Sequence, residues 1–263
     1  MENDSLGKKD MLESVKAILA QIAVRGEDDG ERFTNTARVD AIAECLKGSG
    51  WRLFHDGSLA RIYAHHGFNQ SKPAVVVSSH VDMVADHCYA DCDGKLWKGS
   101  FDNLITNAVA VACMKADAFA PNVLVAFTGD EEEESGGADE VAETLEARGV
   151  AVKFAVVTDV TSEGWAEGKS FTIENVLPEE DEDEQAELVK ELRASVSAID
   201  PRPCMIVEGE QDEAWEYDEY EIPTCSVCIP CAGDMHSEEG VEIRPSAVEP
   251  YAQALAAVSR AML

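Results

Sequence analysis

Continuous apolar runs bounded by turn residues dominate the middle of the chain. The segments 73–81 (PAVVVSSHV), 122–130 (NVLVAFTGD) and 152–160 (VKFAVVTDV) lack polar alternation, which is typical of strands covered on both faces. Segments with helical spacing lie between them, at 103–114 and 138–150. This alternation predicts an α/β fold, a three-layer αβα sandwich with a mostly parallel central sheet.

The flanking segments complete this arrangement. Helical spacing predicts helices at 8–24 and 35–45, the second ending near Gly48 or Gly50. The remaining predicted elements are strands at 51–56 and 60–66, a two-stranded excursion at 87–100, a helix opened by the acidic run 178–187 and continuing to 197, strands at 204–210 and 223–230, and a closing helix at 248–263. Because no internal repeat or linker is evident, we expect residues 1–263 to form a single catalytic domain.

Composition and charge narrow the classes of partner. The chain has 263 residues and a formal net charge of −31, which argues against nucleic acid and anionic membranes as partners. No apolar run approaches the roughly 18 residues of a membrane helix. The polar start MENDSLGKKDMLE does not resemble a signal peptide, so a cytoplasmic protein is expected. The eight cysteines are then expected to be reduced thiols.

Five residues of types that bind metal ions occur at or near strand ends. They are His80, Asp102, Glu132, Asp159 and His236. Strand ends are where ligand and catalytic groups converge in an open α/β sheet. The order and spacing of the five predict a site that surrounds two metal ions.

His80 and Asp82 lie two residues apart on a predicted strand, so their side chains point the same way. A carboxylate beside a ligating histidine accepts its other N–H and fixes its tautomer. Asp82 therefore fits a supporting role for His80. Taken alone, the same pattern favours a structural histidine over a metal ligand.

The acidic residues also allow two interpretations each. The two oxygens of Asp102 suit a carboxylate that bridges two cations, but its place before a helix is also typical of a cap. The glutamates 131–134 follow a buried strand and would ordinarily form a solvated loop. Two adjacent carboxylates at a strand end can instead divide the work, one binding metal and the other transferring a proton.

The series HVD, GSFDN, TGDEEEESGGA, VVTDVT and IPTCSVCIP followed by MHSEE resembles the motifs of the dinuclear zinc exopeptidase superfamily. That group contains zinc aminopeptidases, carboxypeptidases related to glutamate carboxypeptidase, and acyl-amino-acid deacylases. The resemblance covers residues 11 to 263. It implies that Asp102 bridges two metals, that His80 and Asp159 complete one site and Glu132 and His236 the other, that Glu131 is the general base, and that Asp82 supports His80.

The chain departs from the family pattern in two loops. Glu134 replaces the first glycine of the pattern D-E-E-x-G-x-x-G-A, which leaves Glu132 and Glu133 as an alternative to Glu131 and Glu132. The stretch DEAWEYDEYEIPT stands where relatives often have a glycine-rich turn. Its tyrosines and acids either bind the free amine of a peptide or cover the sheet edge.

The intervals between motifs are short. Neither Asp82 to Asp102 nor Asp159 to His236 holds an extra domain in addition to its connecting elements. The chain therefore resembles a bare catalytic domain without a lid or dimerisation insert, and a monomer is expected. The single-domain aminopeptidase branch and the cytosolic branch that usually carries a lid both remain open.

Three cysteines, Cys225, Cys228 and Cys231, form a C-x-x-C-x-x-C pattern that can hold an iron–sulfur cluster or zinc. They fall on a predicted strand, where residues three apart face opposite sides. This favours buried free thiols over a cluster.

Together these features predict a metal-dependent hydrolase of peptide or amide bonds, foremost an aminopeptidase acting on a peptide substrate. Mixed imidazole and carboxylate ligands favour two zinc ions, with cobalt or manganese able to substitute. The alternatives are an N-acyl amino acid deacylase or carboxypeptidase, and a non-catalytic metal-binding relative.

Overall fold

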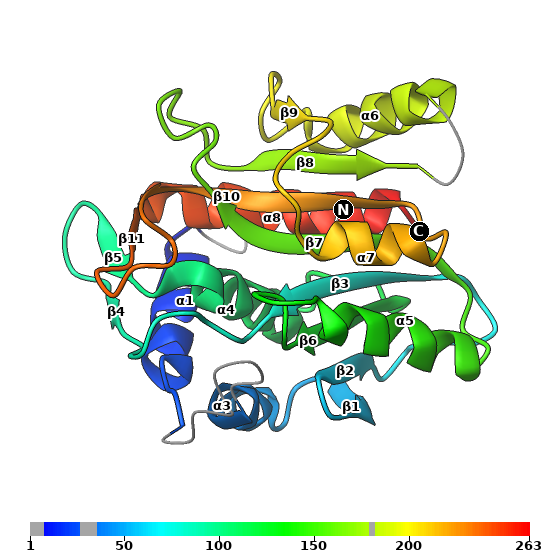
Figure 1. Ribbon diagram of the computed structural model, residues 1–263, viewed down its shortest axis with the longest axis horizontal. Coiled ribbons are helices and arrows are strands. Elements are labelled where there is room, and N and C mark those ends of the chain that lie inside the picture. The colour runs from blue at the N-terminus through cyan, green and yellow to red at the C-terminus, as the bar shows by residue number, and fades with distance from the viewer. Residues whose placement is uncertain (1–7, 27–35, 179–181) are drawn as a thin grey trace.

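The seven residues of β3 (Ala74–His80) are all buried and lie at the centre of the sheet. The computed structural model describes residues 8–26, 36–178 and 182–263. A strand that is apolar throughout needs cover on both faces, and Figure 1 shows helices in front of and behind the sheet. The predicted α/β fold with a mostly parallel central sheet is confirmed.

The described residues form strands of very different length. Besides β3 they are β1 (Trp51–Asp56), β2 (Ala60–His65), β4 (Ala90–Asp91), β5 (Trp97–Gly99), β6 (Val123–Thr128), β7 (Val152–Thr161), β8 (Thr172–Leu177), β9 (Cys204–Ile206), β10 (Thr224–Gly233) and β11 (Val241–Ile243). The helices are α1 (Lys8–Ile22), α3 (Thr36–Leu46), α4 (Phe101–Lys115), α5 (Gly136–Ala147), α6 (Glu182–Val196), α7 (Glu213–Glu219) and α8 (Pro245–Ala261).

The four central strands β6, β3, β7 and β10 run parallel to one another. Antiparallel strands extend the sheet on both sides: β2 and β1 beyond β6, and β11, β5 and β4 beyond β10. The first part of β10 also pairs with β8, which in turn pairs with β9. Because parallel strands end at the same edge, the carboxyl ends of the four central strands come together.

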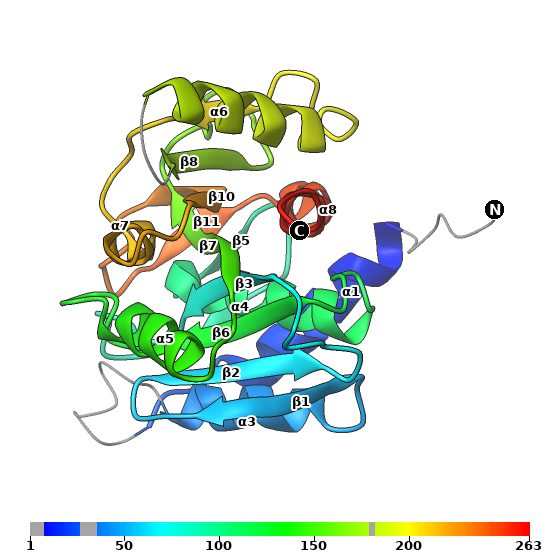
Figure 2. The ribbon, with the colours of Figure 1, turned by 90° about the vertical axis from the view of Figure 1, so that its right-hand side faces the viewer.

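Two helical layers of unequal size cover the sheet (Figure 2). Helices α1, α4 and α8 bury the larger core cluster, in which Leu19, Leu104 and Leu255 pack against the back of the sheet. Helices α5 and α7 cover the other face with a smaller cluster that includes Val141 and Tyr217. Helix α6 lies over β8, and α3 lies beside α1.

Most predicted elements are present, and three are additional. Strand β8, helix α7 and strand β11 were not predicted. The expectation for the acidic and aromatic stretch before β10 needs correction, since α7 forms there and covers a face of the sheet rather than its edge. The predicted helix start at Asn35 and the acidic residues 179–181 lie outside the described residues.

All eight cysteines are free thiols. Cys225 and Cys231 pack in the larger core cluster, while Cys228 is buried beside Asp159 and Thr172 in the strand register. The three cysteines of β10 therefore divide between the two faces, and none belongs to a possible metal group among the described residues.

No helix in the described parts of the chain has both the length and the apolar character needed to cross a membrane.

Candidate metal centre

The predicted ligand residues come from five different segments. His80 ends β3, Asp159 lies near the end of β7, and Asp102 lies in the first turn of α4. Glu132 lies in the turn after β6, and His236 follows β10. The fold thus brings together residues that are far apart in the sequence.

These side chains form two groups that share one member. In each group the potential ligand atoms lie within 4.8 Å of one another, and the groups are His80, Asp102 and Asp159, and Asp102, Glu132 and His236. A third group, His80, Glu131 and Glu132, overlaps both. Asp102 is the member common to the first two groups.

Each oxygen of Asp102 faces a different histidine. Its Oδ1 lies 3.2 Å from Nε2 of His80, and its Oδ2 lies 3.8 Å from Nε2 of His236. His80 Nε2 is also 3.6 Å from Oδ1 of Asp159, and His236 Nε2 is 3.3 Å from Oε2 of Glu132. A carboxylate that faces two donor sets in this way suits two neighbouring cations.

Two atoms at the centre of this arrangement have no hydrogen-bond partner among the described residues. They are His80 Nε2 and Asp102 Oδ1, and both are buried. Buried polar atoms are normally hydrogen-bonded, and several carboxylates so close together repel one another. The donor set of imidazole nitrogens and carboxylate oxygens therefore fits divalent cations.

Asp82 is fully buried and contacts both donor groups. Its Oδ1 lies 3.3 Å from Nδ1 of His80, and its Oδ2 accepts the backbone N–H of Glu132 at 3.1 Å. The first contact fixes the orientation of the His80 ring. The second, which the sequence did not indicate, holds the turn that carries Glu132.

The first two turns of α4 hold the ends of two strands. Asn107 donates hydrogen bonds to the backbone oxygen of His80 and the hydroxyl of Ser79, both at 2.7 Å, and Asn103 donates to the backbone oxygen of Thr158 at 2.6 Å. The peptide bond between Asp102 and Asn103 is cis. Asp102 and Asn103 have non-helical backbone angles, with ψ of 106° and 33°, so the first turn of α4 is kinked. Oδ1 of Asp102 accepts no hydrogen bond from the described residues, so this oxygen does not cap the helix.

The turn after β6 orients two of the four consecutive glutamates inward. Glu131 and Glu132 are partly buried and belong to the clustered groups, whereas Glu133 and Glu134 are exposed. Ser135 N–H donates to the backbone oxygen of Asp130 at 2.6 Å and closes the turn. A Cβ atom at Gly137 would lie 2.5 Å from the backbone oxygen of Gly129, so α5 can start here only with glycine.

Sequence comparison places the chain in a family. The model of peptidase family M20/M25/M40 matches residues 76–261. The chain belongs to this family. Membership confirms the predicted class, a metal-dependent hydrolase of the exopeptidase type, and peptidases of family M20 use divalent metal ions. No curated protein matches the sequence.

Solved structures with the same fold include proteins of more than one activity. Aminopeptidase PepT from Bacillus cereus matches with a TM-score of 0.69 and 10% identity, over 95% of this chain and 98% of that chain. An aminopeptidase from the archaeon Desulfurococcus kamchatkensis gives 0.67 and 11%, over 94% of each chain. Glutaminyl cyclase from Macrostomum lignano gives 0.67 and 12%, over 100% of this chain and 94% of that one. At such identities the matches establish the fold alone.

Burial and crowding shift the acid–base properties of this M20/M25/M40 peptidase. Burial raises the pKa of Glu131 to about 10 and that of Glu132 to about 8, with further increases from the neighbouring carboxylates. Burial lowers the pKa of His80, but the charge of Glu131 and the contacts with Asp102 and Asp159 outweigh it and raise this pKa well above its usual value. Bound cations would favour the charged carboxylates and reverse the shifts of the acids.

Three buried acidic residues were not predicted from the sequence. Asp212 caps α7 by accepting the N–H of Ala214 at 2.9 Å, and an aspartate before a helix is a recognisable signal. Glu213 is fully buried and accepts a hydrogen bond from Ser78 at 2.8 Å. Glu174 of β8 is 6% exposed. Neither Glu174 nor Glu213 lies where the spacing of apolar residues predicts a buried side chain, so the sequence does not indicate that they are buried.

Proposed function

We propose that this peptidase is an aminopeptidase with a dinuclear metal centre. His80, Asp102 and Asp159 would hold one ion, and Asp102, Glu132 and His236 the other. The position of Asp102, with one oxygen toward each histidine, is the observation that carries this proposal. A mononuclear site would have no use for a shared carboxylate with this geometry.

Glu131 would act as the general base. Two divalent ions in these groups would acidify a water molecule and polarise the scissile carbonyl. Glu131 accepts the proton of the attacking water and delivers it to the leaving amine. Its Oε2 lies 3.8 Å from His80 Nε2, and its burial limits access of bulk water.

Asp82 would serve as a positioning residue. It contacts His80 and the backbone of Glu132, so it restrains one residue from each group. Restraint of this kind keeps the donor atoms in place when like charges would otherwise push them apart.

Charge favours a free amine over a free carboxylate as the recognised substrate terminus. The chain carries a net charge of −31. This field attracts the ammonium group of a peptide and repels the carboxylate of an N-acyl amino acid. The deacylase and carboxypeptidase alternatives lack such support.

We further propose zinc as the metal, because two histidines and several carboxylates suit zinc best among the common divalent ions. Residues 1–263 would act as one catalytic domain and as a monomer. In support, one sheet joins the strands from β1 to β11, and only β4, β5 and their loops separate Asp82 from Asp102. Light scattering at several protein concentrations tests the monomer.

The experiment that tests the activity is hydrolysis of aminoacyl-anilides and N-acyl amino acids, with zinc, cobalt, manganese or chelator present. We expect metal-dependent release from free-amine substrates alone. Cleavage only of acylated substrates would replace the aminopeptidase with a deacylase. Binding of two metal ions without any turnover would indicate a non-catalytic relative.

Replacement of the base provides the second test. We expect Glu131→Gln to lower kcat at least about a hundredfold while two metal ions still bind, because Gln cannot carry the proton. The matched control is Glu133→Gln, an equal change two residues away at an exposed position. Unchanged turnover in Glu131→Gln together with a loss in Glu133→Gln would transfer the role to Glu133.

A further inference from the structure

Strand β8 carries a buried carboxyl group that has no cationic partner. Glu174 is 6% exposed and accepts a hydrogen bond from the hydroxyl of Thr172 at 2.5 Å. No ion pair joins it to a basic side chain within the described segments, and burial raises its pKa. A buried carboxylate without a positive partner is costly, which makes this group a candidate for binding a cation from outside the chain.

Glu174 lies on the same face of the sheet as the donor groups. Asp159 of β7, Cys228 of β10 and Thr172 of β8 are partners in the strand register, so their side chains share one face. Glu174 is two residues from Thr172 and therefore faces the same way. Two strand spacings, about 10 Å, separate the backbones of β7 and β8. Glu174 lies opposite Ser226, two residues along β10 from Cys228.

A local irregularity fixes this position. Asn175, the next residue in β8, has a positive φ of 45°, which is unusual for a residue other than glycine. Its side-chain oxygen accepts the N–H of Gly209, and its amide donates to the backbone oxygen of Glu210, both at 2.8 Å. These bonds hold the loop before α7 against β8. A Cβ at Gly209 would lie 3.1 Å from Oε2 of Glu174, so the loop backbone covers the carboxylate closely.

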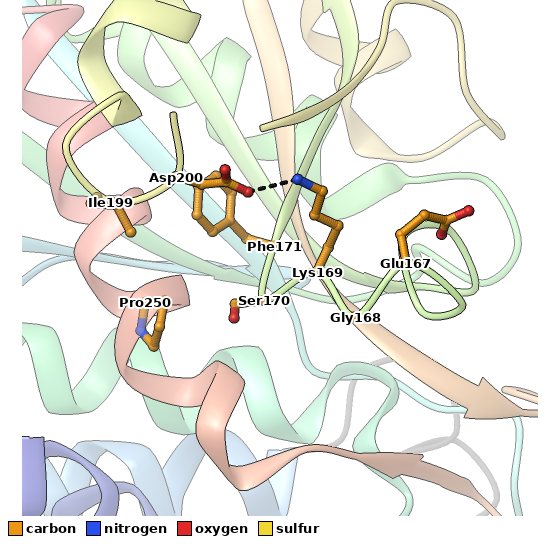
Figure 3. A pocket seen from close by; sticks show the side chains of 8 residues that line it. All are labelled: Glu167, Gly168, Lys169, Ser170, Phe171, Ile199, Asp200 and Pro250. Atoms are coloured by element: carbon orange, nitrogen blue, oxygen red, sulfur yellow. Dashed lines mark hydrogen bonds and ion pairs between the residues drawn. The ribbon is translucent and has the colours of Figure 1, made fainter. Parts of the chain in front are cut away.

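The basic residue nearest to Glu174 in the sequence, Lys169, has other hydrogen-bond partners. Lys169, in the loop before β8, donates to Asp200 at 2.8 Å and to the backbone oxygen of Arg202 (Figure 3). The loop that links β7 to β8 is tied to the loop before β9 in this way. The hydroxyls of Thr172 and Thr161 lower the pKa of Glu174 by hydrogen bonding. The negative charges of Glu163 and Asp159 raise it.

We propose that Glu174 determines specificity by binding the positively charged side chain of a lysine or arginine at the amino end of the substrate. This inference rests on the proposed aminopeptidase function. The α-ammonium group is only two bonds from the scissile carbonyl carbon and stays near the metal ligands. A lysine side chain reaches roughly 6 Å from its Cα, so its ammonium group would extend from the metal ligands toward Glu174.

The test compares lysyl-, arginyl- and norleucyl-anilides, because norleucine has the shape of lysine without the charge. We expect kcat/KM for the lysyl substrate to exceed that for the norleucyl substrate at least tenfold. In Glu174→Gln this preference should fall about tenfold or more, with the norleucyl rate unchanged, as loss of a charge-assisted hydrogen bond predicts. The control Glu208→Gln removes an exposed carboxylate near the same loop and should change neither rate.

Two kinetic results would overturn the inference while leaving the aminopeptidase intact. One is a lysine preference that is absent or that survives Glu174→Gln. The other is an equal loss for lysyl and norleucyl substrates in Glu174→Gln, which would indicate binding of the α-ammonium group or a structural role.

A binding measurement separates this inference from the proposed activity. Calorimetric titration of the metal-loaded protein with lysinamide and norleucinamide requires no turnover. We expect tighter binding of lysinamide by at least tenfold, lost in Glu174→Gln and kept in Glu208→Gln. If no anilide is hydrolysed but this difference is found, the proposed activity fails and the cation site stands. Equal affinities for the two amides would refute the site.

Discussion

At the scale of single residues, the most unusual environment belongs to Glu213. Its side chain is fully buried, its Oε2 accepts a hydrogen bond from Ser78, and its Oε1 has no partner within the described part of the chain. Tyr217 extends the same network by donating to the Ser78 hydroxyl at 3.1 Å. Burial raises the pKa of Glu213 from 4.5 to about 7, so the neutral carboxyl is the form that the folded protein favours.

This shift predicts a pH-dependent stability. The folded state holds the proton more tightly than the unfolded state, so the stabilising contribution is complete below about pH 4.5 and is lost as the pH rises through about 7. A shift of this size corresponds to roughly 3 kcal/mol. Glu213→Gln keeps the shape and cannot ionise. We therefore expect it to weaken the fall in unfolding free energy between pH 5 and pH 8, measured by urea denaturation.

The control for this prediction is Glu208→Gln, which removes an exposed carboxylate and should leave the pH dependence as in the unchanged protein. If the free energy of unfolding changes equally with pH in the original chain and in Glu213→Gln, Glu213 is already ionised in the folded state.

The residues in and near the candidate site differ in whether the sequence alone predicts them. His80, Asp102 and Asp159 could be selected because each stands at a strand or helix boundary in a recognisable motif. The burial of Glu174 and Glu213 could not, because tertiary packing by the loop at Gly209 and by α7 creates it. An acid that becomes buried only through a distant segment carries no local signal.

At the scale of elements, the same limit applies to β8 and α7. Strand β6 could be predicted because all its residues but one are apolar and all are buried. Strand β8 is equally buried, but Thr172, Glu174 and Asn175 interrupt its apolar pattern. Helix α7 has only seven residues, too few for a clear periodicity. Short or polar elements depend on their neighbours more than on their own sequence.

Helix α7 depends on its cap. Asp212 accepts the N–H of Ala214 and also a hydrogen bond from the Ser226 hydroxyl of β10, so it fixes the helix to the sheet. We expect Asp212→Ala to lower the free energy of unfolding by about 1–3 kcal/mol, since it removes a cap and leaves a buried hydroxyl without its acceptor. Chemical denaturation measures this change.

A matched pair of variants gives this prediction its controls. Glu219→Ala alters an exposed residue at the other end of α7 and should change stability little. Asp212→Asn keeps a good capping residue and should recover most of the loss. An Asp212→Ala protein as stable as Glu219→Ala would show that the cap contributes nothing.

At the scale of the whole molecule, negative charge is the dominant feature. The chain has 52 acidic and 21 basic residues, and its central groups bring several carboxylates within a few ångströms. Charges of one sign destabilise a compact state through mutual repulsion. Cations that bind the folded protein alone therefore stabilise it in proportion to their affinity.

We expect saturating zinc or manganese to raise the Tm and excess chelator to lower it. A concentration a thousandfold above Kd contributes about 4 kcal/mol per site. Sodium chloride at matched ionic strength measures the part that is due to screening alone. Asp102→Asn, which weakens the shared ligand, should lose most of the specific shift. The same specific shift in that variant would mean that the ions bind elsewhere.

The two contacts of Asp82 have a consequence for how the ions bind. One carboxylate touches His80 of the first group and the backbone of Glu132 in the second. We therefore expect occupancy of either group to change the restraint on the other, and thermodynamic reciprocity requires the same factor in both directions. The proposed centre would then be a cooperative unit rather than a pair of independent ligand sets, and the order in which it fills would depend on Asp82 as much as on the ligands.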